Sequence, residues 1–144
     1  MAPLQKRAWY GLAIGVVFTI ALIVVFIAKG GISTFNEDQG FRIIIDVLWI
    51  GVLLTAFIST GLTLRKPGQV DERDRLIVGR AQVIQLWAVI LALVAWMIAL
   101  TESYWDEGQI PVIFPYLILI STLIVSTLAQ SLGILIGYWR GVSR

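Results

Sequence analysis

Residues 8–28 read AWYGLAIGVVFTIALIVVFIA, a stretch of 21 residues without Lys, Arg, Asp or Glu. Because a bilayer core about 30 Å thick needs roughly 20 apolar residues at about 1.5 Å each, this stretch is long enough to cross it as an α-helix. It is also longer than the apolar part of a signal peptide, which has about 7 to 15 residues. We therefore expect a retained transmembrane helix.

Three further runs of the same kind follow along the chain. They cover residues 43–64, where Asp46 is the only charged residue, residues 81–101 and residues 108–139. Each run can cross the bilayer once, and none is long enough to cross it twice. The sequence thus predicts an all-α integral membrane bundle of four transmembrane helices in a single domain, residues 1–144. The expected helices lie at about 8–28, 43–64, 72–101 and 111–139.

The composition excludes most enzyme classes. Hydrophobic residues make up 58% of the chain and charged residues 14%, whereas about 25% of a typical soluble domain is charged. The chain has no Cys and no His, which excludes disulfides, thiolate or imidazole metal sites, and Ser-His or Cys-His nucleophiles. The carboxylates expected at one rim, Glu102, Asp106 and Glu107, share no compact motif. We expect no enzyme, and no catalytic, cofactor-binding or metal-binding residue.

The basic residues predict how the chain is oriented. Nine of the eleven lie at the two termini and in the connection between the second and third expected helices, and only Lys29 and Arg42 lie on the other side. Since Lys and Arg near helix ends stay in the cytoplasm, both termini are predicted to be cytoplasmic. The net charge of +2 comes from these helix ends rather than from a basic patch, so no nucleic-acid partner is expected.

Aromatic residues gather near the expected helix ends, where amphipathic rings favour the headgroup layer. The inner boundary holds Trp9, Tyr10, Tyr138 and Trp139, and the outer one holds Phe35, Phe41, Tyr104, Trp105, Phe114 and Tyr116. Three tryptophans, Trp49, Trp87 and Trp96, lie deeper. We interpret these three as packing residues.

Small residues recur at i, i+4 spacing in each expected helix. In lipid, helices associate where small residues let their backbones approach closely. The glycines expected at such contacts are Gly11, Gly15, Gly51, Gly133 and Gly137. Packing within one four-helix bundle and packing between subunits both fit this pattern.

Asp46 is the only acidic residue inside an expected span, one turn beyond Arg42. A carboxylate at that depth disfavours lipid exposure. Since Arg42 is at i−4, the two side chains share a helix face and are expected to form an ion pair. The alternative interpretation makes Asp46 a site for a proton or a cation.

Hydroxyl and amide side chains line parts of two expected helices. They are Thr55, Ser59, Thr122, Ser126 and Gln130. One interpretation is a narrow polar path through the membrane. The other is that these side chains bond to carbonyls of their own helix or across a helix interface.

The two expected outer connections resemble each other. Residues 35–40 read FNEDQG and residues 104–109 read YWDEGQ, 69 residues apart. A duplication of a two-helix hairpin would produce this pattern. Two unrelated acidic turns would produce it equally well.

The expected inner connection, between the second and third helices, is residues 65–82 and reads RKPGQVDERDRLIVGRAQ. Asp71 is expected to cap the next helix, with Glu72 and Asp74 in its first turn and Arg75 placed to pair with Asp71. The third helix would therefore start in the cytoplasm. The segment is interpreted as a solvated, self-paired helix start, or alternatively as a docking site made of Asp71, Glu72, Arg73, Asp74, Arg75 and Arg80.

The Asp-Glu-Arg-Asp-Arg pattern at residues 71–75, followed by Arg-Ala-Gln at residues 80–82, resembles a segment of known proteins. It is similar to the DERDR-type segment before the third helix of small, uncharacterised prokaryotic four-helix membrane proteins. This resemblance implies a multi-pass protein of a prokaryotic plasma membrane. It supplies no catalytic residue.

Taken together, these patterns favour a non-catalytic protein of the lipid bilayer. We expect it to act as a homo-oligomer or as an accessory subunit beside other membrane proteins. The alternative is a small transporter or channel, with the polar path as its route and Asp46 as its ionisable site.

Overall fold

The computed structural model describes residues 2–64 and 71–142, apart from the side chains of residues 56, 59–64 and 142. Four long helices and one short 3-10 helix make up this part of the chain: α1 (Pro3–Lys29), η1 (Ile32–Asn36), α2 (Gln39–Leu64), α3 (Glu72–Tyr104) and α4 (Ile113–Val142). No strand occurs among these residues. The predicted all-α class is confirmed.

Three of the helices are long and apolar enough to cross a membrane, which indicates a membrane protein. Among the described residues, these candidate spans are Pro3–Lys29, Glu72–Tyr104 and Ile113–Gly141. A fourth span would fall on α2, whose last six side chains lie outside the description. That span is therefore taken up below as part of a proposal.

The helices begin and end several residues away from the predicted positions, for local reasons. Pro3 starts α1 early, because a first-turn N–H has no helical partner for proline to lose. Gly30, with φ 82°, ends α1 in the left-handed conformation that favours glycine. In α4, Pro115 falls within the first turn, so the missing N–H again costs no helical hydrogen bond.

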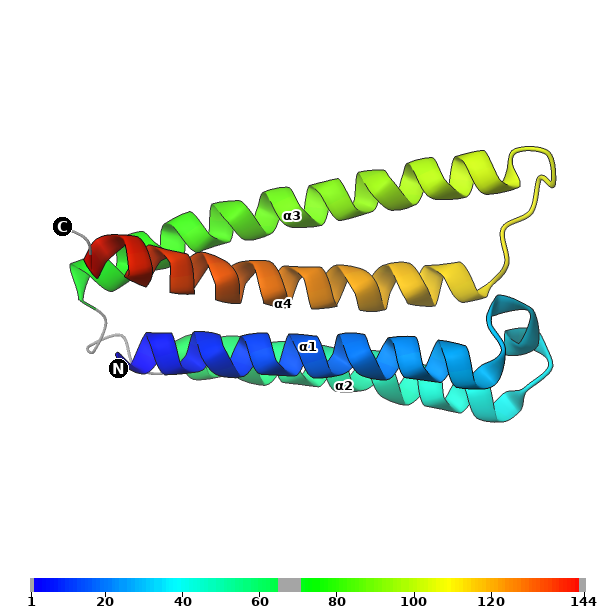
Figure 1. Cartoon of the computed structure of the whole chain (residues 1–144), viewed down its shortest axis with the longest axis horizontal. Coiled ribbons are helices and arrows are strands. Elements are labelled where there is room, and N and C mark those ends of the chain that lie inside the picture. Colours follow the sequence, from blue (N-terminus) through cyan, green and yellow to red (C-terminus); the bar gives the residue numbers. More distant parts are fainter. Residues whose placement is uncertain (1, 65–70, 143–144) are drawn as a thin grey trace.

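Helix α4 is the centre of the fold. It packs against α3 along its length, against α1, and to a smaller extent against α2, whereas α1 and α2 contact each other little. Figure 1 shows α4 running between α3 on one side and the α1–α2 pair on the other. We call the end that holds Pro3, Glu72 and Val142 the terminal end, and the end that holds η1 the connection end.

Two apolar clusters form the core, one toward each end. The larger cluster is at the connection end and contains Phe35, Phe41, Ile45, Val52, Ile113, Phe114, Leu117, Ile120 and Ile124. The smaller one is at the terminal end and contains Ala8, Ile77, Ala81, Ile134 and Tyr138. The start of α1 and the end of α4 therefore lie together, so both termini are at the same end of the bundle (Figure 1).

The five glycines expected at helix contacts each lie against another helix of this same chain. A Cβ atom added to Gly15 would lie 2.6 Å from Leu128 Cδ2, and one added to Gly133 would lie 2.9 Å from the Cα of Ala81. The nearest atoms to such a Cβ on Gly11, Gly51 and Gly137 belong to Ser131, Phe18 and Ile77. Packing within the bundle is thus enough to account for these small residues.

Candidate functional site

Arg42 and Asp46 lie on the same helix but bind different partners. The Arg42 guanidinium donates from Nε to the carbonyl of Phe35, 3.2 Å away, and from Nη2 to the carbonyl of Asn36, 2.7 Å away. Asp46 instead accepts a hydrogen bond of 3.0 Å from Trp49 Nε1. The ion pair predicted between Arg42 and Asp46 is wrong, because η1 brings two backbone carbonyls within reach of Arg42.

The residues expected to form a polar path face different neighbours. Thr55 donates to the Gly51 carbonyl of its own helix, 2.7 Å away, whereas Ser126 accepts from Gln85 Nε2 of α3 at 2.6 Å. The Thr122 hydroxyl is buried without a hydrogen-bond partner among the described residues. Gln130 is half-buried, and the side chain of Ser59 lies outside the described part.

Among the described residues, three cross-helix hydrogen bonds join α3 to α4. The interpretation of hydroxyls that bond across a helix interface covers Ser126, whereas the partners Gln85, Trp96 and Tyr138 were not predicted. Besides the Gln85–Ser126 bond, Trp96 Nε1 donates to Ser121 Oγ at 2.8 Å, and the Tyr138 hydroxyl donates to Asp74. The interpretation of Trp96 and Trp49 as packing residues is therefore incomplete, since both indole N–H groups have polar acceptors. The Trp96–Ser121 pair can be recognised only once α3 and α4 are paired, whereas Trp49 lies three residues after Asp46 on the same helix.

The proposed docking segment is divided between two environments. Asp71 Oδ1 accepts from the backbone N–H of Glu72 at 2.8 Å, so this carboxylate caps α3. The spacing predicts an ion pair between Asp71 and Arg75. Among the described residues this ion pair does not form. Asp74 is bound to Tyr138 of α4. The other four residues of the segment, Glu72, Arg73, Arg75 and Arg80, are exposed, although the Arg73 guanidinium lies beside Gly141.

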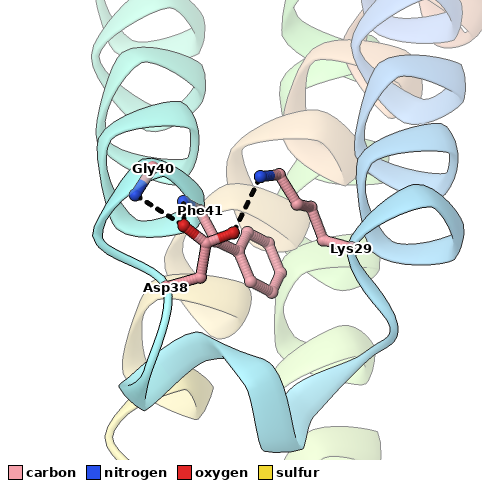
Figure 2. A network of polar contacts seen from close by, with 4 residues as sticks. All are labelled: Lys29, Asp38, Gly40 and Phe41. Atoms are coloured by element: carbon pink, nitrogen blue, oxygen red, sulfur yellow. Dashed lines mark hydrogen bonds and ion pairs between the residues drawn. The ribbon is translucent and has the colours of Figure 1, made fainter.

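Figure 2 shows the polar contacts that close the connection between α1 and α2. Lys29 Nζ lies 2.7 Å from Asp38 Oδ2, and Asp38 Oδ1 accepts from the N–H groups of Gly40 at 2.8 Å and Phe41 at 3.2 Å. Asp38 is thus the N-cap of α2. The hydrogen bond from Lys29 is the largest cause that lowers the pKa of Asp38. Desolvation is the next largest and opposes it, and the hydrogen bonds from Phe41 and Gly40 lower the pKa further.

A cavity of about 280 Å³ lies between α1, α2 and α4. Most of its lining is apolar, including Ile14, Phe18 and Ile124, and Arg7 is its one charged residue. Within residues 2–64 and 71–142, no three Asp or Glu residues gather closely enough to hold a metal ion. The cavity was not predicted, because its residues come from three helices whose pairing the sequence does not specify.

No protein-family model, curated protein or solved structure matches this chain. The similarity of residues 71–82 to the DERDR-type segment therefore stays a prediction.

Proposed function

We propose that this protein is a non-catalytic integral membrane protein of a prokaryotic plasma membrane that acts by associating with other membrane helices. The partner is a second copy of the chain, or a larger membrane protein that this chain serves as an accessory subunit. The free face of α3 is the surface that we assign to this association.

The observation that carries the proposal is how little of α3 the chain itself covers. In the described chain, no residue of the most apolar 18-residue window of α3 is buried, compared with 6% of the corresponding window of α1 and 33% of that of α4. The free face of α3 consists of Gly79, Val83, Leu86, Ile90, Val94 and Met97, all exposed. Gly79 is the small residue of this face, of the kind that lets helix backbones approach closely in membrane proteins.

Gly79 adds a second argument from the same face. Glycine in a helix interior destabilises the helix by about 0.8–1.0 kcal/mol relative to alanine. In the part of the chain that the structure describes, nothing lies within 4 Å of a Cβ added to Gly79. Its small size therefore serves no contact among the described residues, and close approach of a partner helix would explain it.

The proposal includes four crossings with both termini in the cytoplasm. Three apolar spans and a fourth of 22 residues with one charged residue support the number. The position of both termini at one end of the bundle agrees with an even number of crossings (Figure 1). The nine basic residues on that side support the cytoplasmic orientation.

A transporter or channel is the weaker alternative. Thr55 lines the cavity beside α1, and Ser126 is bound to α3. Asp46 is held by Trp49 of its own helix. These contacts satisfy three of the polar groups, and the buried Thr122 hydroxyl has no partner among the described residues. The groups therefore face separate neighbours and give no support to a single route along α2 and α4.

Because the chain has no Cys, a single introduced cysteine provides a clean test of the association. Leu86→Cys places a thiol on the free face of α3, with 58% of the native side chain exposed. We expect mild oxidation in native membranes to give a disulfide-linked dimer, and the intact complex to have the mass of an oligomer or of a fixed heteromeric assembly. A monomeric mass together with no cross-link would overturn the proposal.

Val17→Cys is the matched control. Val17 is 63% exposed and lies fourteen residues into α1, the same number that separates Leu86 from the start of α3. Both cysteines would therefore meet lipid at a similar depth. Equal cross-linking at the two positions would indicate random collision in the membrane and would count against a specific face.

A further inference from the structure

Arg7 carries a buried polar atom that no other described residue satisfies. Its Nη2 atom is shielded from solvent and has no hydrogen-bond partner among the described residues. A guanidinium provides five N–H donors and cannot lose its charge at ordinary pH. Leaving such a donor buried and unpaired is costly, so an acceptor from outside the chain is expected at this position.

The same side chain lies at one end of the apolar cavity between α1, α2 and α4. On α1 the lining extends from Arg7 to Phe18, a distance of roughly 16 Å for eleven residues of helix. The other walls include Val52 of α2 and Ile124 of α4. The site is therefore an elongated apolar space with a cation at one end.

The remaining polar groups of the lining are already bonded or exposed. Thr55 and Thr127 donate to the carbonyls of Gly51 and Leu123, one turn earlier in their own helices. Tyr10 is 71% exposed. The described residues of the lining include no carboxylate, so none of them neutralises Arg7 or would attract a cationic group.

We propose that this cavity binds one anionic phospholipid of the surrounding bilayer, with its phosphate on the Arg7 guanidinium and an acyl chain among Ile14, Phe18 and Ile124. Arginine matches phosphate oxygens with two parallel hydrogen bonds. Arg7 is in the second turn of α1, beside the Trp9 and Tyr10 rings that favour the headgroup layer. A lipid phosphate lies at that level, and the membrane supplies it at high local concentration.

The absence of a carboxylate in the lining determines which headgroup fits best. A phosphatidylcholine headgroup brings a quaternary ammonium that would lie near Arg7 without an acidic partner. Phosphatidylglycerol brings the same phosphate without that cation. The site is thus selective for a net negative headgroup, and this selectivity is independent of whether α3 associates with a partner.

The test is native mass spectrometry of the delipidated full-length protein in detergent, titrated with phosphatidylglycerol or with phosphatidylcholine of the same acyl chains. We expect one tightly bound phosphatidylglycerol per chain and at least tenfold weaker binding of phosphatidylcholine. Equal affinity for the two lipids would overturn the proposal. Tighter binding of palmitate than of phosphatidylglycerol would overturn the assignment to a phospholipid.

The variants separate Arg7 from general surface charge. Arg7→Gln should weaken phosphatidylglycerol binding at least tenfold, and Arg7→Lys should weaken it less, because the charge remains but the paired donors are lost. The control is Lys6→Gln, which removes the neighbouring charge from an exposed residue outside the lining and should change affinity less than twofold. Equal effects of Lys6→Gln and Arg7→Gln would show attraction to surface charge only and would overturn the proposal.

A cavity-filling variant tests the apolar end by a separate route. In Thr55→Phe the ring would occupy the space beside Ile14 and Phe18, at the loss of a single bond within α2. We expect both lipids to bind at least tenfold more weakly, with an unchanged helical circular dichroism spectrum. Unchanged lipid affinity in this variant would show that the acyl chain lies elsewhere.

Discussion

The two helical hairpins of this protein are held together in different ways. Helices α3 and α4 pack directly on each other, and three cross-helix hydrogen bonds join them. Helices α1 and α2 contact each other little, and α4 is their common partner. The helices of the first hairpin are thus held together mainly by their contacts with α4 of the second hairpin. The helices of the second hairpin hold together through their own direct interface.

The connections of the two hairpins differ as much as their interfaces. Residues 35–40 take part in η1 and in the start of α2, where Phe35 is buried and Asp38 binds Lys29. In residues 104–109, Tyr104 ends α3 and its half-buried ring packs on Phe114. The other five residues are exposed and contain Gly108 with φ 64°. The two segments are therefore similar in sequence but not in structure. In the first, Asp38 binds Lys29 and caps α2, whereas in the second the acidic residues are exposed.

The largest effect is expected where the second hairpin is closest. In Gly133→Ala the added Cβ would lie 2.9 Å from the Cα of Ala81 and 3.0 Å from its Cβ. Since a backbone atom cannot move away as a side chain can, α3 and α4 must separate. We expect the free energy of unfolding in detergent to fall by about 1–3 kcal/mol.

Gly79→Ala is the matched control for this prediction, because Gly79 is a helical glycine of α3 with open space around it. We expect this substitution to stabilise the monomer by about 0.5–1 kcal/mol through helix propensity. If both variants shifted stability in the same direction, the α3–α4 contact at Gly133 would not limit the stability of the hairpin.

A smaller effect is expected from the polar contacts of the same interface. Ser126→Ala leaves the Gln85 amide without its acceptor. Cross-helix hydrogen bonds in membrane proteins contribute on average about 0.6 kcal/mol and at most about 1.7 kcal/mol. A double-mutant cycle with Gln85→Met should give a coupling free energy in this range.

Thr127→Val serves as the control for the Ser126 variant. It also removes a hydroxyl from α4, but that hydroxyl donates to Leu123 of its own helix. We expect a smaller loss of stability from Thr127→Val than from Ser126→Ala. A coupling free energy of zero between Gln85 and Ser126 would remove hydrogen bonding as the distinction between the two hairpins.

The sequence predicts the helices well because each is specified locally, by a run of apolar residues about as long as the bilayer is thick. It predicts the Asp71 cap for the same reason, since a cap involves neighbours in the chain. Contacts between separate elements could not be predicted in this way, because they depend on how the helices pack. Examples are the hydrogen bonds of Arg42 to η1 and of Trp96 to Ser121, and the position of Arg7 in the cavity lining. Two local signals were missed: Asp38, whose position just before Gln39 is that of an N-cap, and Trp49, which lies three residues after its acceptor Asp46.

The smallest and most local effect is expected at the connection of the first hairpin. The contacts of Asp38 lower its pKa in the folded protein from an unfolded value of about 3.9. Because the unfolded chain then binds a proton more readily, the stabilisation is fully present above the unfolded pKa and is lost as the pH falls through the folded value. Below about pH 4, the protection of the Gly40 and Phe41 amides against hydrogen exchange, measured relative to their intrinsic exchange rate at the same pH, should therefore fall in the wild-type protein. Asp38→Asn should show low protection at both amides already at neutral pH, whereas Asp106→Asn, an exposed residue of the second connection, should leave their protection unchanged. Protection that is independent of pH in the wild type would mean that η1, rather than the Lys29–Asp38 contact, holds the first connection closed.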